Sequence, residues 1–136
     1  MDSSVLMAAT ISARGRARDL LNAGFRGELT LIVSEDVIGE CRRNLVRKAT
    51  HILPLFEEFL ATIPDRAEPT VEVTRAVAKV IELKDAPIVA AAIAARATHL
   101  ASYDRRHLLA KADEINDRYG IVVATPDMIL TEDDDA

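Results

Sequence analysis

Apolar runs and the polar residues between them divide this chain into alternating helices and short strands. The β-branched run "LTLIV" at 29–33 predicts a strand that is buried on both faces. Two further strands are predicted by "HLASY" at 99–103 and "IVVAT" at 121–125, and the alternating "PTVEV" at 69–73 predicts a short fourth one. Because helical segments separate these strands, we expect an α/β domain whose sheet is parallel and covered by helices on both faces.

Capping and turn residues mark where the helices begin and end. Ser34 precedes two acidic residues and should open one helix, while Pro54 fits the first turn of another. Gly24 and Gly27 are expected to supply the stop and the turn after an earlier helix. The predicted helices are those at 4–12, at 16–23, from Ser34, from Thr50 and at 74–83.

The longest apolar segment, "DAPIVAAAIAARATHLASYD", has an aspartate at each end. Asp85 should cap a helix that has Pro87 in its first turn, that is buried nearly all round, and that ends near Thr98. The strand after it leads straight to Asp104. Since ligands of parallel α/β sheets bind beyond the carboxyl ends of the strands, both carboxylates are candidate site residues.

Clustered carboxylates at a sheet edge suit Mg²⁺ or Mn²⁺, which prefer oxygen ligands. Such an ion can polarise a phosphoryl oxygen and activate a water for in-line attack. Each aspartate taken singly has a simpler explanation, because Asp85 can serve only as a helix cap and Asp104 only as a turn residue. The residues alone leave both interpretations open.

Composition favours a single globular domain, which we place at 1–130 of the 136 residues. The acidic segment 131–136 is expected to be a disordered tail. One cysteine, Cys41, and the lack of a signal peptide or membrane span predict a cytoplasmic protein. The net charge of -5 argues against a binder of duplex nucleic acid, although arginines cluster locally.

Three segments together resemble the PIN domain, a nuclease fold that includes the VapC-type toxins of bacterial toxin–antitoxin pairs. They are "DSSVL" at 2–6, "SEDVIGE" at 34–40 and "DAPIVAAAIAARATHLASYDRRHL" at 85–108. "GIVVATPDMIL" near the end is similar to the last strand and short helix of that family. The resemblance implies a three-layer α/β/α fold with a central parallel sheet, and a metal-dependent endoribonuclease that uses Mg²⁺ or Mn²⁺.

The resemblance also implies the roles of individual residues. Metal-binding, catalytic carboxylates fall on Asp2, Glu40, Asp85 and Asp104, with Ser4 and Ser102 as supporting polar residues. Arg105 and Arg106 are candidate contacts to RNA phosphates. The implied partners are an RNA substrate, a small antitoxin protein and a second copy of the chain in a homodimer.

One feature departs from the family pattern, because PIN domains carry a short apolar strand before the first aspartate and here only Met1 precedes Asp2. Either the start is truncated or the strand has been lost. We expect loss of the strand to leave Asp2 mobile, to weaken metal binding and to expose the edges of the neighbouring strands to another chain. The alternative function is therefore a non-catalytic PIN-like module that binds RNA or protein.

Overall fold

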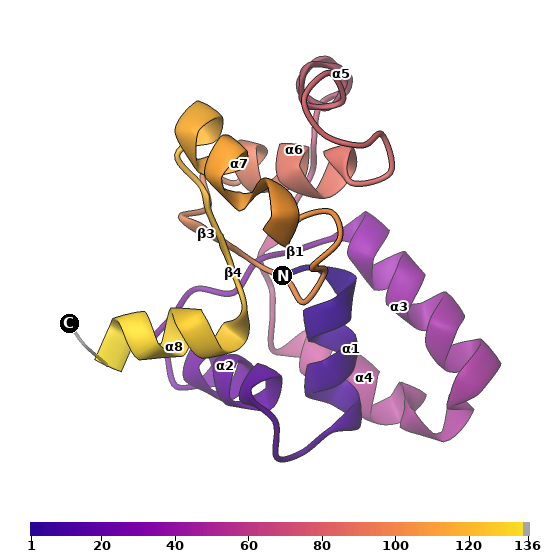
Figure 1. Ribbon diagram of the computed structural model, residues 1–136. Coiled ribbons are helices and arrows are strands. Elements are labelled where there is room, and N and C mark those ends of the chain that lie inside the picture. The colour runs from indigo at the N-terminus through magenta and orange to yellow at the C-terminus, as the bar shows by residue number, and fades with distance from the viewer. Residues whose placement is uncertain (135–136) are drawn as a thin grey trace.

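The computed structural model describes residues 1–134, and helices make up most of them (Figure 1). The helices are α1 (Ser3–Ile11), α2 (Arg16–Phe25), α3 (Glu35–Lys48), α4 (Leu53–Ala61), α5 (Val71–Val77), α6 (Ala86–Ala94), α7 (Ala112–Tyr119) and α8 (Pro126–Asp134). Short 3₁₀ turns, η1 (Thr50–Ile52) and η2 (Leu109–Lys111), precede α4 and α7. The strands are β1 (Val33–Ser34), β2 (Arg66–Ala67), β3 (His99–Ala101) and β4 (Val122–Ala124).

The strands form two separate parallel pairs. β1 pairs with β2 with Val33 opposite Arg66, and β3 pairs with β4 with His99 opposite Val122. Parallel strands joined through helices are the α/β organisation that the sequence predicts. Within residues 1–134, however, the ladders do not join into the continuous central sheet that we expected.

Two hydrophobic cores lie on either side of this division. The first is built mainly from α1 to α4 and includes Leu6, Leu21, Ile38, Leu45 and Phe56. The second is built mainly from α5, α6, α7, β3 and β4 and includes Val77, Val89, Leu100, Leu108 and Ile115. Ile88 of α6 packs against both cores, so α6 is one of the elements that join them.

The N-terminus lies between the two strand pairs, in the middle of the molecule (Figure 1). The Met1 amino group donates to the carbonyl oxygen of Ile32 at 3.0 Å, on the β1 side. The next residue, Asp2, donates its backbone N–H to Ala101 of β3 at 2.9 Å. Residues inside a parallel sheet bond alternately to the left and right neighbour in this way. Met1 and Asp2 thus link the β1 and β3 sides through two backbone hydrogen bonds.

The prediction of a strand at 69–73 is wrong. Thr70 instead caps α5, and its hydroxyl accepts from the backbone N–H of Val73 at 3.2 Å. The alternation of "PTVEV" was misleading because a threonine followed by an acidic first turn also begins a helix. The neighbouring strand, β2, lies at Arg66–Ala67, which the sequence analysis missed.

Several boundaries also differ from the predicted ones. Only Val33 of the run 29–33 pairs, with Ser34 following it. The helix that begins after Asp85 ends at Ala94, short of Thr98, and Arg96 beyond its cap has a left-handed φ of 56°.

The two glycines after the second predicted helix have different roles. Gly24 does not stop α2, which continues to Phe25. A Cβ on Gly24 would lie 2.2 Å from Cδ1 of Leu31, so this glycine permits close packing. Gly27, with φ of 78°, makes the predicted turn.

The C-terminal helix, α8, extends into the segment expected to be a disordered tail. It continues through residue 131 to Asp134, and residues 135–136 lie outside the described part of the chain. None of the helices within residues 1–134 has the length and hydropathy that a membrane span requires.

Candidate active site

Asp2 is held by hydrogen bonds at the start of α1. Its Oδ1 caps the helix by accepting from the backbone N–H of Ser3 at 2.8 Å. Its Oδ2 accepts from the hydroxyl of Ser4 at 3.1 Å and from the hydroxyl of Ser102 at 2.7 Å. We expected Asp2 to be mobile. In the structure every polar group of Asp2 has a hydrogen-bond partner, so the residue is held in place.

The two serines join the start of α1 to the loop after β3. Ser102 is fully buried, and its hydroxyl oxygen accepts from the backbone N–H of Asp104 at 3.0 Å. Ser4 accepts in the same way from the N–H of Tyr103 at 3.0 Å. Each hydroxyl therefore donates to Asp2 and accepts from the loop, which fixes the position of Asp2 relative to Asp104.

Asp104 stabilises the turn in which it lies. Its Oδ1 accepts from the backbone N–H groups of Arg106 and His107, both at 3.2 Å, and its Oδ2 lies 3.3 Å from Nδ1 of His107. The interpretation of Asp104 as a turn residue is therefore confirmed. A turn role alone does not explain why Asp104 lies close enough to Asp85 to act on its charge.

Asp85 begins α6 but does not cap it as predicted, since its side chain forms no capping hydrogen bond. Its Oδ2 is buried and has no hydrogen-bond partner among residues 1–134. Burial raises the pKa of the Asp85 carboxyl; the charge of His107 lowers it, and the charges of Asp104 and Asp2 raise it further. Asp104 and Asp2 are thus close enough for their charges to repel that of Asp85.

Glu82 and His107 also belong to this region, although the sequence analysis did not select them. Nε2 of His107 lies 3.3 Å from Oε2 of Glu82. One possible ligand atom from each of Glu82, Asp85 and His107 lies within 4.8 Å of the other two. The signal that could have found them is spacing, because Glu82 precedes Asp85 by three residues and His107 follows Asp104 by three, so each pair spans a single turn.

Glu40, the fourth predicted carboxylate, is exposed on α3 and does not belong to that group of ligand atoms. The neighbouring Cys41 is fully buried, and its pKa is raised to about 12, first by burial and then by the charges of Glu40 and Asp2. A thiol with such a pKa is unreactive at neutral pH. Glu40 and Asp2 are thus both close enough to Cys41 for their charges to act on the thiol.

Arg105 and Arg106 are exposed in the loop after Asp104. Neither forms an ion pair with another residue of the described part of the chain. Arg106 borders a cleft of about 40 Å³ together with Asp85, His107 and Lys111. The guanidinium groups are therefore free to contact an anion beside the carboxylates.

The residues present fit a hard divalent cation. Carboxylate oxygens are the ligands that Mg²⁺ and Mn²⁺ prefer, and a buried carboxylate oxygen without a partner is unfavourable unless something compensates for its lost hydration. Such an ion would give the Oδ2 of Asp85 a partner and would offset the repulsion of Asp85 by Asp104 and Asp2. Asp85 would hold it, with Glu82 and His107 as the other residues of the group of close ligand atoms, while Asp2 and Asp104 lie outside that group.

Comparison with known proteins agrees with the family that the motifs suggest. A family model described as the PIN domain matches residues 1–106, which contain all four predicted carboxylates. No curated protein and no solved structure matches the chain.

Proposed function

The chain belongs to the PIN domain family, and from that premise we propose that it is an endoribonuclease that requires Mg²⁺ or Mn²⁺. PIN domains are usually metal-dependent nucleases. The observation that carries the proposal is the buried Oδ2 of Asp85, which has no hydrogen-bond partner among residues 1–134 and whose carboxyl group is repelled by the charges of Asp104 and Asp2. This arrangement is unfavourable for a folded protein without a cation, so a function that uses a cation explains why it is there.

A bound Mg²⁺ or Mn²⁺ supplies charge neutralisation at the phosphoryl group and activation of the attacking water. The chain's own residues set the geometry. Ser4 and Ser102 donate to one oxygen of Asp2 and so fix its orientation. His107 contacts both Asp104 and Glu82 and keeps the loop after β3 folded against the start of α6.

Single-stranded RNA is the proposed substrate. The net charge of -5 does not favour a nucleic acid, but several exposed cations adjoin the carboxylates in the sequence or line the same cleft as Asp85. Lys84 adjoins Asp85, while Arg105 and Arg106 follow Asp104 and Lys111 borders the same cleft as Asp85. These groups offer phosphate contacts that are independent of base sequence, which suits a nuclease.

The biological setting is proposed from the family resemblance. We propose that the chain acts in the cytoplasm as a VapC-like toxin, that a small antitoxin protein binds it, and that it forms a homodimer. Co-expression of the neighbouring gene and the mass of the purified complex would test the two protein partners.

The decisive experiment is cleavage of an end-labelled single-stranded RNA in Mn²⁺ and in EDTA. We expect wild type to cleave in Mn²⁺ only, and Asp85→Asn to lose at least about 100-fold in rate, because a direct ligand should matter no less than the groups that orient it. Asp117→Asn, an exposed aspartate of α7, is the matched control and should keep full activity. Cleavage that survives EDTA or Asp85→Asn would contradict the proposal.

The exposed position of Glu40, outside the group of close ligand atoms formed by Glu82, Asp85 and His107, favours the alternative of a non-catalytic binding module. A binding module would hold RNA equally well in EDTA, and would do so with Asp85→Asn. Fluorescence anisotropy with the same RNA measures this directly. If wild type binds RNA without metal and never cleaves it, the binding module is the correct function.

A further inference from the structure

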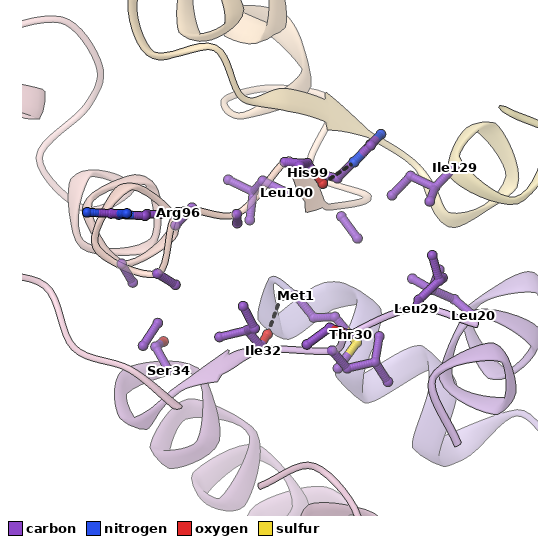
Figure 2. Close-up of a pocket in the computed structure, with 18 of the residues that line it drawn as sticks. Met1, Leu20, Leu29, Thr30, Ile32, Ser34, Arg96, His99, Leu100 and Ile129 are labelled. Carbon is purple, nitrogen blue, oxygen red and sulfur yellow. Dashed lines mark hydrogen bonds between the residues drawn. The ribbon is translucent and has the colours of Figure 1, made fainter. Parts of the chain in front are cut away.

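Two of the molecule's cavities have linings that differ in chemistry. The larger is a slot of about 570 Å³ between the two strand pairs, with residues 29–32 on one wall, residues 98–101 on the other and a largely apolar surface (Figure 2). The smaller is the cleft of about 40 Å³ at the start of α6, where Glu82, Asp85 and His107 bring possible ligand atoms within 4.8 Å of one another. A cavity of the smaller size has room for an ion and a water but not for an organic ligand.

His107 lies between two carboxylates in this cleft. Its Nδ1 is 3.3 Å from Oδ2 of Asp104, and its Nε2 is 3.3 Å from Oε2 of Glu82. Because an ionised carboxylate only accepts hydrogen bonds, Nδ1 carries the proton that faces Asp104. The lone pair of Nε2 would then repel the carboxylate of Glu82 unless a proton or a metal ion lies between them. Nε2 is therefore the ring nitrogen that is available to a cation.

Asp104 is placed to orient the imidazole. Histidines that bind metal ions usually donate their other ring N–H to a carboxylate or a carbonyl, which fixes the direction of the ring. Asp104 is itself held by the backbone N–H groups of Arg106 and His107, both at 3.2 Å. The His107 side chain is only 23% exposed, so packing restricts the ring as well. The orientation of Nε2 is thus set before any ion binds.

The backbone that carries the possible ligands is also fixed. The N–H of Asp85 donates to the carbonyl of Glu82 at 3.0 Å and closes the turn between them. Ile81 and Leu108, the neighbours of Glu82 and His107, are buried in the second core and border the cleft. Preorganised ligands lose little conformational freedom on binding, and apolar walls strengthen the attraction between an ion and its ligands.

The charges around the cleft suit a cation. The buried Oδ2 of Asp85 has no hydrogen-bond partner among residues 1–134, so an ion would gain a ligand that no other group uses. Arg106 and Lys111 also border the cleft. Arg106 is exposed, however, and the ammonium group of Lys111 lies 3.5 Å from a carboxylate oxygen of Glu114. Neither cation therefore has to occupy the place of an ion.

We propose that the ligands of the ion are Asp85, Glu82 and Nε2 of His107, and that this site selects Mn²⁺ over Mg²⁺. Asp104 is then a positioning residue that acts through His107. Mg²⁺ prefers oxygen ligands alone, whereas imidazole suits first-row transition ions, and two carboxylates with one imidazole favour Mn²⁺. The inference rests on the metal-dependent function proposed above, because it concerns the ion of that same site. It differs from the ligand set of carboxylates alone that the family resemblance implies.

Electron paramagnetic resonance of Mn²⁺ bound to the full chain, without RNA, tests the ligand set directly. The protein is first treated with a chelator, and spin-echo envelope modulation then detects any nitrogen that is bonded to the ion. We expect an imidazole nitrogen signal in wild type and its loss in His107→Gln, which keeps a polar side chain. His51→Ala removes an exposed histidine of η1 and is the matched control, so it should keep the signal.

Affinities measured by the same method test the selectivity. The signal of free Mn²⁺ gives its dissociation constant, and competition gives that of Mg²⁺. In His107→Gln the preference for Mn²⁺ over Mg²⁺ should fall by at least about tenfold, because the remaining ligands are oxygens.

The role of Asp104 needs a pair of variants. Asp104→Asn should weaken Mn²⁺ binding by about 10- to 100-fold and keep the nitrogen signal, as expected for a group that orients a ligand. In the His107→Gln background the same change should have no further effect, because Asp104 acts through His107. A further loss in that background would mean that Asp104 is itself a ligand, and the proposal would be wrong.

The remaining outcomes separate this inference from the proposed function. Mn²⁺ bound without a nitrogen signal, or with the signal lost in His51→Ala, would overturn the ligand set and leave the nuclease function intact. A nitrogen signal from His107 in a protein that never cleaves RNA would support the ion site and contradict the nuclease. No binding of Mn²⁺ at all would contradict both.

Discussion

The gap between β1 and β3 differs at its two ends. At the carboxyl end, Met1 and Asp2 fill it, and every polar group of Asp2 is paired. At the other end the same two walls enclose an apolar slot of about 570 Å³. The walls are alike, and the difference lies in whether a chain segment occupies the space between them. Two residues are therefore enough to organise the candidate active site, but not to complete a sheet.

Removing Asp2 should have the largest effect on the filled end. Asp2→Ala loses the helix cap and the acceptor for two hydroxyls, one of them on the fully buried Ser102. We expect a loss of about 3 kcal/mol in the free energy of unfolding. Urea denaturation measures it. Asp2→Asn keeps an acceptor oxygen and should lose much less, so equal losses for the two variants would contradict this account.

Titration of the Met1 amino group should have the next largest effect. Burial lowers its pKa from 8.0 to about 6. Between these pH values the unfolded chain binds a proton that the folded chain does not, so stability should be highest above pH 8 and fall as the pH decreases to 6. The loss is at most about 2.7 kcal/mol, and smaller where water in the slot reaches the amine. Thermal unfolding of the N-terminally acetylated chain is the control and should lack this component.

Partial filling of the open end should stabilise the protein. Ala91→Leu adds apolar atoms to the slot and should raise the free energy of unfolding by about 1 kcal/mol. Ala94→Leu, on the exposed side of α6, should change it little. The two variants need only a comparison of melting temperatures. A destabilised Ala91→Leu would mean that the slot is smaller in solution than in this structure.

Neutralising Asp85 should have the smallest effect, and its sign should depend on metal. Burial raises the pKa of Asp85, so its charge destabilises the metal-free fold above its ordinary pKa of 3.8. Asp85→Asn should therefore stabilise the metal-free protein at pH 7 by about 0.5 kcal/mol, a value reduced by solvent screening. Calorimetry in Mn²⁺ should show the reverse order, since only wild type gains from binding the ion.

Local signals were read correctly from the sequence where a short-range interaction decides the structure. Ser34 caps α3 as predicted, with its hydroxyl accepting from Val37 at 3.2 Å. Pro54 lies in the first turn of α4 and Gly27 in a turn with positive φ. In each case the residue's own chemistry fixes its backbone, so neighbours in the fold hardly matter.

Pairing between strands could not be predicted in the same way. The run 29–33 has the composition of a buried strand, but residues 29–31 form no backbone hydrogen bond with any residue that the structure describes. A strand is defined by its partner, and no partner is encoded within the run itself. Glu40 was assigned to the metal site by a family motif alone. In the structure it lies on an exposed face of α3.

The division into two cores has a consequence for how the molecule unfolds. Within residues 1–134 no ladder joins the β1–β2 pair to the β3–β4 pair across the slot, where Met1 and Asp2 provide two backbone hydrogen bonds between them. Each core therefore has the means to open as its own cooperative unit, with different protection against amide exchange. Denaturation followed by different probes should give transitions that do not coincide, even though the chain has the length of a single domain.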